Sequence, residues 1–142
     1  LHERAGSSRI VHLHGELTKV CSSRDPHNPH YIKELKPEEY EVKMGDKADD
    51  GTQLRPFIVW FGEAVPEIET AIQYVEKADI FVIIGTSLNV YPAAGLLHYV
   101  PGGAEVYLID PKPVDTHTSR SIHVIQKGAS EGMGELKQLL GV

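Results

Sequence analysis

An unbroken apolar run that ends in a polar turn constrains the fold most strongly. Phe81, Val82, Ile83 and Ile84 stand in succession and are followed by Gly85-Thr86-Ser87. A short run rich in β-branched residues is typical of a strand buried on both faces, as in a parallel sheet. The carboxyl ends of such strands are where α/β proteins bind ligands. The pattern therefore predicts an α/β fold with a ligand at Gly85–Ser87, although the turn alone could simply reverse the chain.

The residues after 64 alternate between helical and strand patterns. Pro66 suits the first turn of a helix, and Ile68, Ile72 and Val75 recur on one stripe of it. The elements expected in order are a helix over 66–77, a strand over 80–84, a short helix over 92–99, strands over 105–109 and 121–126, and a helix over 131–140. This order predicts part of a doubly wound, Rossmann-like α/β domain with a parallel sheet.

The first half of the chain is less regular. Residues 1–5 predict a helical turn, and residues 9–14 predict a strand that places His12 and His14 on one face. Residues 16–54 are polar and rich in proline and glycine, so we interpret them as a small, irregular inserted module. The main domain is then expected over residues 1–15 and 55–142.

Composition limits the possible partners. The chain has 142 residues, a formal net charge of −6 and no basic cluster, which argues against binding nucleic acid. No apolar run approaches the roughly 18 residues of a membrane span, and no signal peptide pattern opens the chain. The single cysteine, Cys21, cannot form an internal disulfide and is typical of a reducing compartment. These features predict a cytoplasmic protein with no membrane partner.

Histidines are the first candidates for chemistry. An imidazole titrates near neutral pH, so His14 at a strand end could act as a general base, or it could be an ordinary surface histidine. His12 and His14 lack a third metal ligand nearby. Cys21, His27 and His30 suggest zinc, but a structural zinc site takes four ligands, usually as two close pairs, and no second pair follows. We therefore expect no metal.

A second candidate is the strand-like segment 55–63. Successive residues of a strand point to opposite sides, so either Trp60 or Phe61 is expected to line a cleft. An edge strand ending in Gly62-Glu63 could also pair with an extended peptide. The turn at 127–130 follows a later strand and could flank the same crevice. Each segment could equally be plain core or turn.

Taken together, the segments resemble the carboxyl-terminal part of the sirtuins, the NAD-dependent protein-lysine deacylases. Val11-His12-Leu13-His14-Gly15-Glu16-Leu17 is similar to the family's catalytic histidine motif. Val59-Trp60-Phe61-Gly62-Glu63 is similar to its acyl-lysine strand, and Gly85-Thr86-Ser87 to its NAD-binding turn. The resemblance implies NAD as co-substrate and acyl-lysine proteins or peptides as substrates.

The resemblance also assigns roles to individual residues. His14 would take a proton from a ribose hydroxyl of NAD, so that the acyl group passes from lysine to ribose. The residues implied to contact NAD are Gly85, Thr86, Ser87, Asp110 and Ala129. Those implied to contact the acyl-lysine substrate are Val59, Trp60, Phe61, Gly62, Glu63, Val90 and Tyr91.

Three departures from the family pattern matter. The Gly-Ala-Gly-Ile-Ser and Gln-Asn-Ile-Asp motifs are absent, so we expect a truncated chain that binds NAD poorly and is inactive alone. The paired zinc cysteines are also absent, which predicts a metal-free module. Asp110 stands where the family usually has asparagine. Trp60 and Tyr91 favour the bacterial subgroup that also removes acidic acyl groups such as succinyl.

Truncation would leave an apolar edge at strand 80–84, a template for pairing with a second copy of the chain. The competing interpretation is a non-catalytic nucleotide-binding or protein-interaction module on the same partial Rossmann scaffold, which fold alone does not exclude.

Overall fold

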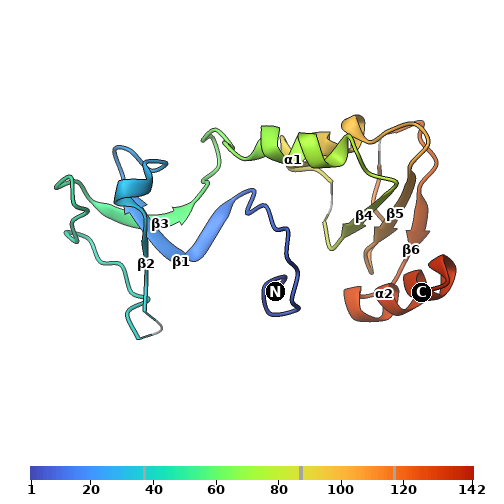
Figure 1. Ribbon diagram of the computed structural model, residues 1–142, viewed down its shortest axis with the longest axis horizontal. Helices are drawn as coiled ribbons and strands as arrows, with labels where there is room; N and C mark the ends of the chain where they lie inside the picture. The colour runs from blue at the N-terminus through green and yellow to red at the C-terminus, as the bar shows by residue number, and fades with distance from the viewer. Residues whose placement is uncertain (37, 87, 117) are drawn as a thin grey trace. The chain divides into compact units, whose positions relative to one another are not determined.

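The computed structural model describes residues 1–36, 38–86, 88–116 and 118–142. Internal contacts divide these residues into two compact units, Leu1–Glu67 and Ile68–Val142. Each unit contains its own sheet (Figure 1).

The second unit contains a parallel sheet with the order β4-β5-β6. Its strands are β4 (Ile80–Ile84), β5 (Glu105–Ile109) and β6 (His123–Ile125). β4 and β5 have the predicted bounds, and Ile80 pairs with Glu105 and Ile84 with Ile109. The predicted α/β fold with a parallel sheet is confirmed, and it brings the carboxyl ends of β4 and β5 to one edge.

Helices cover both faces of this sheet. They are α1 (Ile68–Val75), the 3₁₀ helix η2 (Ala93–Tyr99) and α2 (Ala129–Leu140). The helix expected over 66–77 is shorter in the structure, and the short helix over 92–99 is of the 3₁₀ type. None of the helices in the described ranges has the length and hydrophobicity needed to cross a membrane.

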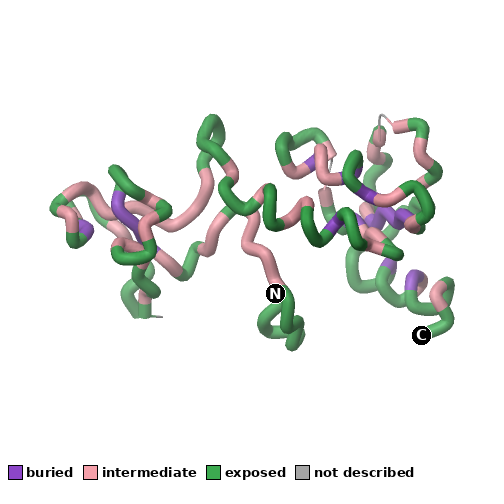
Figure 2. Tube along the Cα trace, turned by 45° about the horizontal axis from the view of Figure 1, so that its top comes forward, coloured by how far each residue is buried: buried purple, intermediate pink, exposed green. Residues whose placement is uncertain are grey.

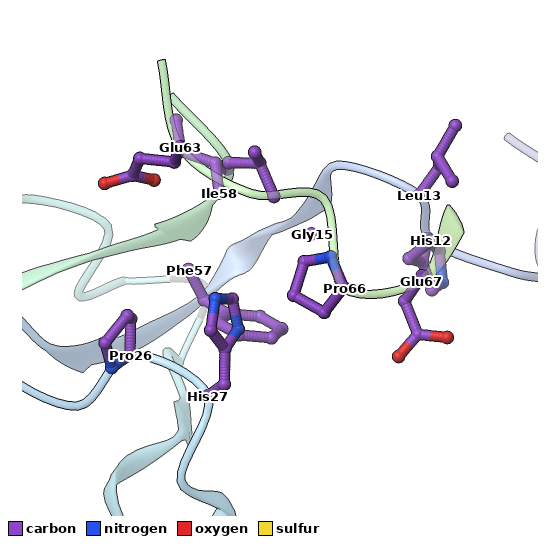
Figure 3. A pocket seen from close by; sticks show the side chains of 11 residues that line it. His12, Leu13, Gly15, Pro26, His27, Phe57, Ile58, Glu63, Pro66 and Glu67 are labelled. Atoms are coloured by element: carbon purple, nitrogen blue, oxygen red, sulfur yellow. The ribbon is translucent and has the colours of Figure 1, made fainter. Parts of the chain in front are cut away.

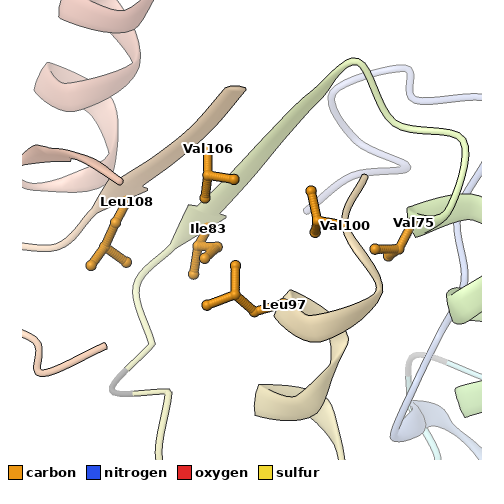
Figure 4. Packing of buried hydrophobic residues seen from close by; sticks show 6 residues of the cluster. All are labelled: Val75, Ile83, Leu97, Val100, Val106 and Leu108. Carbon is orange, nitrogen blue, oxygen red and sulfur yellow. The ribbon is translucent and has the colours of Figure 1, made fainter. Parts of the chain in front are cut away.

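Side chains of β5 alternate between two cores. Val106 and Leu108 face a cluster that includes Val75 of α1 and residues of η2 (Figure 4). Tyr107 and Ile109 face the other way and pack with Ile125 and Leu136. β5 is therefore the buried central strand of this sheet. Figure 2 shows how buried and exposed residues are distributed along the Cα trace.

β4, in contrast, forms an edge of the sheet within the described residues. Ile83 is buried, but Ile80 and Ile84 are 44% and 43% exposed. Burial on both faces was expected for Phe81–Ile84, and it is wrong for Ile84, which is exposed because β4 has a strand neighbour on one side only. The uncovered apolar edge agrees with expectation, while pairing with a second copy through it stays a prediction.

The first unit contains an antiparallel sheet with the order β2-β1-β3. β1 spans Gly15–Ser22, β2 Lys33–Glu34 and β3 Leu54–Ile58, and the 3₁₀ helix η1 (Pro29–Tyr31) lies between β1 and β2. The strand expected over 9–14 is wrong, because strand pairing begins only at Gly15. Residues 15–22 thus form a strand within the segment that was expected to be irregular, although its pairing with β3 shifts register between Glu16 and Val20.

This pairing joins a strand of the expected insertion to a strand of the expected main domain. β3 was assigned to the main domain and residues 16–54 to an insertion, yet Cys21 of β1 pairs directly with Arg55 of β3. The contacts accordingly divide the chain at Glu67 and Ile68. The assignment of residues 1–15 and 55–142 to one NAD-binding domain stays a prediction.

A buried hydroxyl holds the end of β1. Ser22 is fully buried, and its hydroxyl donates to Asp50 at 2.6 Å while it accepts from the backbone N–H groups of Arg24 and Asp25. The Thr52 hydroxyl donates to the same carboxylate at 2.7 Å. The Ser22 and Thr52 hydrogen bonds lower the pKa of Asp50 to about 2. The network joins the end of β1 to the turn that precedes β3.

The packing of α2 gives a first prediction. Gly132 lies against the sheet, where an added Cβ would lie 2.2 Å from the Cγ2 atom of Ile109, whereas a Cβ on Gly134 would meet no atom within 4 Å. Gly132→Ala should therefore lower the free energy of unfolding by about 1 to 3 kcal/mol through overpacking. Gly134→Ala, in the same helix, should raise it by about 0.5 to 1 kcal/mol. Urea unfolding measures both, and equal effects would contradict this packing.

The Ser22 network gives a second prediction. Ser22→Ala removes the acceptor of two backbone N–H groups and a donor to Asp50, so it should cost about 1 to 3 kcal/mol of unfolding free energy. Ser23→Ala is the matched control, because Ser23 is exposed and should be nearly neutral. Thermal unfolding of the two variants distinguishes them. A Ser22→Ala variant as stable as the control would show that the network is not stabilising.

Candidate functional site

Residues 12–15, called the histidine turn below, are hydrogen-bonded to the residue that follows β3. The N–H of Gly15 donates to the His12 carbonyl at 3.0 Å and closes a turn. Gly15 has a φ of +82°, and an added Cβ would lie 2.2 Å from the Phe57 carbonyl oxygen. Both the conformation and the contact require glycine. The N–H of Val59 then donates to the His14 carbonyl at 3.0 Å.

This lock places His14 beside the predicted acyl-lysine segment. The His14 side chain is exposed, and its backbone is hydrogen-bonded to Val59, the first residue of that segment. His14 therefore lies in a turn just before β1, not on the face of a strand. The hydrogen bond joins two motifs that are 45 residues apart in the sequence.

A small cavity of about 40 Å³ lies under the turn (Figure 3). Its lining is mostly apolar and consists of His12, Leu13, Gly15, Pro26, His27, Phe57, Ile58, Val59, Glu63, Pro66 and Glu67. His12 and Val59 are therefore part of this lining and His14 is not. A space of this size accommodates a few water molecules or a small apolar group.

His12 has a structural environment of its own. Its Nε2 atom lies 2.6 Å from Oε1 of Glu3 and 3.6 Å from Oε2 of Glu16. The other carboxylate oxygen of Glu16, Oε1, accepts a hydrogen bond from Lys19. His12 is thus held by carboxylates rather than paired with His14. In the described part of the chain, no three or more His, Cys, Asp or Glu side chains gather as a metal site. The expected lack of zinc stays a prediction.

The segment expected to be the acyl-lysine strand forms a turn. β3 ends at Ile58, and the N–H of Glu63 donates to the Trp60 carbonyl at 3.0 Å. The expectation that Trp60 and Phe61 alternate across a strand is therefore wrong. Phe61 is 95% exposed and Trp60 is 50% exposed. Gly62, with a φ of +89°, makes the turn possible.

Glu63 braces this turn from within. Its carboxylate accepts two hydrogen bonds from Arg55, at 2.6 and 2.9 Å, and one from the N–H of Trp60 at 2.9 Å. These bonds lower the pKa of Glu63 to about 2. The Arg55 guanidinium also lies 5.7 Å from the centre of the Trp60 ring, within cation–π range. The Glu63 side chain is thus committed to holding the turn.

A second candidate site lies at the carboxyl edge of the parallel sheet. The N–H of Gly85 donates to the Ile109 carbonyl at 2.9 Å, so Gly85 and Asp110 are neighbours across adjacent strands. Both line a cavity of about 480 Å³, a size typical of ligand pockets. The other lining residues are Asn89, Pro111, Lys112, Pro113, Val114 and Asp115.

The structure thus brings together some predicted NAD contacts. Thr86 accepts a hydrogen bond from the N–H of Leu88 at 3.3 Å and shapes the turn after β4. Ser87 lies outside the described residues. Val90 and Tyr91 are exposed beyond the turn, Ala129 begins α2, and these three residues are not part of the lining.

Sequence reasoning missed the contribution of residues 111–115. Only Asp110 of this loop was named as an expected contact, yet residues 111–115 also line the cavity. Its position after a buried parallel strand was the available signal, because loops at that edge are where α/β proteins bind ligands.

The backbone on the Gly85 side of this cavity is open. Gly85 has a φ of +65°, and a Cβ built on it meets no atom within 4 Å, so a ligand could approach the backbone there closely. Gly85 and Asp110 line the cavity, whereas Thr86 does not. These residues belong to the second unit and His14 to the first, so their convergence on one ligand stays a prediction.

Comparison with known proteins identifies the family of the chain. Residues 1–92 match the model of the Sir2 family. An NAD-dependent protein deacylase of Bacteroides thetaiotaomicron is 93% identical over 140 residues, which cover 99% of this chain and 60% of the relative. A Helicobacter pylori protein of the same name is 48% identical over 136 residues, or 96% of this chain and 57% of that one.

Solved structures agree with this result. A Sir2 homologue in complex with NAD has a TM-score of 0.78 and 33% sequence identity, and the match covers 99% of this chain and 54% of the homologue. Sir2Tm bound to a propionylated peptide has a TM-score of 0.75 and 26% identity, over 99% of this chain and 60% of that one. The chain spans about 60% of the length of the Bacteroides relative. By the family match and these identities, it belongs to the Sir2 family of sirtuins.

Proposed function

We propose that this chain carries the catalytic histidine and the acyl-lysine segment of an NAD-dependent protein-lysine deacylase. One observation carries the proposal: the hydrogen bond from Val59 to the His14 carbonyl, set by Gly15, holds the two motifs together. The relatives at 93% and 48% identity are named NAD-dependent protein deacylases. Members of the family have also been solved with NAD and with a propionylated peptide.

Different residues of this chain would bind NAD, accept the proton and bind the acyl-lysine substrate. NAD, when bound, supplies the acceptor for the acyl group. Gly85, Thr86 and Asp110 would hold it at the sheet edge, while the exposed His14 imidazole would take a proton from a hydroxyl group. Val59 and Phe61 would line the path of the acyl-lysine side chain, and the backbone of Gly62 and Glu63 would pair with the peptide.

The finer assignments are part of the same proposal. Ser87 and Ala129 would contact NAD, and Trp60, Val90 and Tyr91 would contact the substrate. Removal of acidic acyl groups such as succinyl, in addition to acetyl, is expected from Trp60 and Tyr91. The alternative function is that of a non-catalytic nucleotide-binding module. The cavity at Gly85 and Asp110 supports this alternative, because no residue of the histidine turn lines it.

Catalysis can be tested in a chimera that joins this chain to the remaining part of the Bacteroides thetaiotaomicron relative. We expect the chimera to release acetyl or succinyl groups from lysine peptides only with NAD, and the chain alone to be inactive. His14→Ala should lower turnover by about 100-fold or more, the usual contribution of a general base.

His30→Ala is the matched control, because His30 is exposed in η1 and should leave turnover unchanged. Retention of full activity by His14→Ala would remove the assigned role of that residue. Binding of NAD without any deacylation by the chimera would favour the non-catalytic module instead.

Glu63 is expected to act as a positioning residue for the substrate segment. Glu63→Gln removes the negative charge and one of the two oxygens that accept from Arg55, which should loosen the turn. In the chimera it should therefore raise the peptide KM several-fold with little change in kcat. Glu38→Gln, at an exposed position outside this segment and outside the cavity lining, is the matched control. An unchanged KM, or an equal loss in kcat, would contradict a positioning role.

The same residue gives a pH prediction. The pKa of Glu63 falls from its ordinary value of 4.5 to about 2 on folding, so its stabilising contribution is complete above pH 4.5 and is lost as pH falls through about 2. Between pH 7 and pH 3 the unfolding midpoint should therefore respond differently to acid in Glu63→Gln than in the parent chain. Urea titrations of both proteins at the two pH values measure this, and identical acid responses would show that the Arg55 bridge does not stabilise the fold.

A further inference from the structure

Besides the small cavity under the histidine turn, the first unit has a larger one, called the module cavity below. Its volume of about 340 Å³ is in the range of small-molecule sites. Residues from the segment 40–44 form one wall, and residues 53–56, which include the start of β3, form the other. No residue assigned above to NAD or to the acyl-lysine substrate lines this cavity, so it is a separate site.

One glutamine holds the two walls of the module cavity together. The Gln53 amide donates to the carbonyls of Lys43 and Leu54, at 3.0 and 2.9 Å. Its oxygen accepts a hydrogen bond from the N–H of Gly45 at 2.8 Å. The N–H of Leu54 donates to the Asp46 carbonyl, also at 2.8 Å. The backbone of both walls is therefore fixed before a ligand binds, which lowers the entropic cost of binding.

The edge of β3 at the module cavity does not suit an added peptide strand. The N–H and carbonyl groups of Leu54 on this edge are already taken by Asp46 and Gln53. Pro56, two residues further on, has its backbone on the same edge and lacks an N–H. Strand pairing needs such donors, so we expect the occupant of the cavity to be a small molecule held by side chains.

The lining of the module cavity is suited to an aromatic group. Val42, Leu54 and Pro56 are half-buried and offer apolar surface, which we call the floor. Tyr40 and Met44 are 56% and 92% exposed, so both would bury apolar surface against a ligand. A phenol ring and a polarisable thioether are favourable partners for another aromatic ring. None of the described residues that line the cavity is Asp or Glu, so an anion would meet no carboxylate there.

Two basic residues also line the module cavity. The Arg55 guanidinium is committed to Glu63 by two hydrogen bonds. The Lys43 ammonium lies 3.3 Å from Glu41, and the side chains of this pair are 67% and 77% exposed. Exposed ion pairs contribute little stability, so Lys43 can exchange Glu41 for the carboxylate of a ligand.

We propose that the module cavity binds a small aromatic carboxylate. The aromatic ring packs against Tyr40, Met44 and the floor, and the carboxylate pairs with the Lys43 ammonium. This inference goes beyond the proposed function, because it concerns a ligand other than NAD and acyl-lysine and does not depend on catalysis.

The test is a titration of the 142-residue chain with phenylacetate at low salt, followed by amide NMR. The amide signals of Val42, Met44 and Leu54 should shift with a common dissociation constant. The neutral compound phenylacetamide should bind about fivefold more weakly, since it lacks the charge that pairs with Lys43. Raising the salt concentration should reduce this difference.

Three variants test the assigned contacts. Lys43→Gln removes the charge but keeps the backbone carbonyl that Gln53 holds, so it should weaken phenylacetate binding about fivefold and leave phenylacetamide binding unchanged. Lys36→Gln is the matched control, because Lys36 is also exposed and paired with a glutamate but lies outside the lining, and it should change neither affinity. Tyr40→Leu should weaken binding of both compounds about threefold, through loss of the aromatic contact.

Unchanged binding of phenylacetate by the Lys43→Gln variant would overturn the inference, as would equal affinities of phenylacetate and phenylacetamide for the parent chain. Absence of shifts at the module cavity with phenylacetate at about 20 mM would also overturn it, because a ligand of this size in a fitting site binds more tightly than that. The measurement uses neither NAD nor a lysine peptide, so each of these failures is distinguishable from failure of the proposed function.

Discussion

The close approach of Gly15 to the backbone of β3 is the contact on which the first unit depends. A side chain at this position would overlap the Phe57 carbonyl, and the φ of +82° is itself unfavourable for other residues. Glycine therefore lets the chain turn and begin β1 directly against β3. The histidine of the turn comes to lie at the end of β3 because of this backbone fit, rather than through any contact of its own side chain.

The second unit achieves a similar result by different means. Parallel pairing of β4 and β5 in register places Gly85 next to Asp110, and the burial of β5 on both faces keeps that edge rigid. The loop of Pro111, Lys112 and Pro113 is then free to form a wall, since no strand continues through it. In both units a rigid strand pair presents polar residues just beyond its end, which is where the predicted functional residues lie.

The sequence predicted the parallel sheet better than the antiparallel one, and the reason is physical. β4 and β5 are continuous apolar runs whose burial leaves little choice of structure, so even their bounds were correct. β1 carries Glu16, Thr18 and Lys19 and owes its conformation to its partners β2 and β3, which a local pattern does not show. The expected strand over 9–14 failed for the same reason.

In the candidate sites, too, some residues could be predicted from the sequence and others could not. Gly85 could be singled out because it follows the apolar run of β4, whereas the roles expected of His14 and Asp110 came from the resemblance to the sirtuins. The brace between Arg55 and Glu63 could not, because its two residues lie on opposite sides of a turn that was expected to be a strand. The cavity wall at 111–115 and the Ser22 network likewise depend on tertiary contacts.

The buried hydroxyl network joins segments of the first unit that are distant in the sequence. Ser22 and Thr52 both donate to Asp50, which connects the end of β1 to the turn before β3. Hydrogen bonds to an ionised carboxylate are stronger than neutral ones, and partial burial strengthens them further. Because these donors act on the same segments that flank Cys21 and Arg55, the network also supports the β1–β3 pairing on which the histidine turn rests.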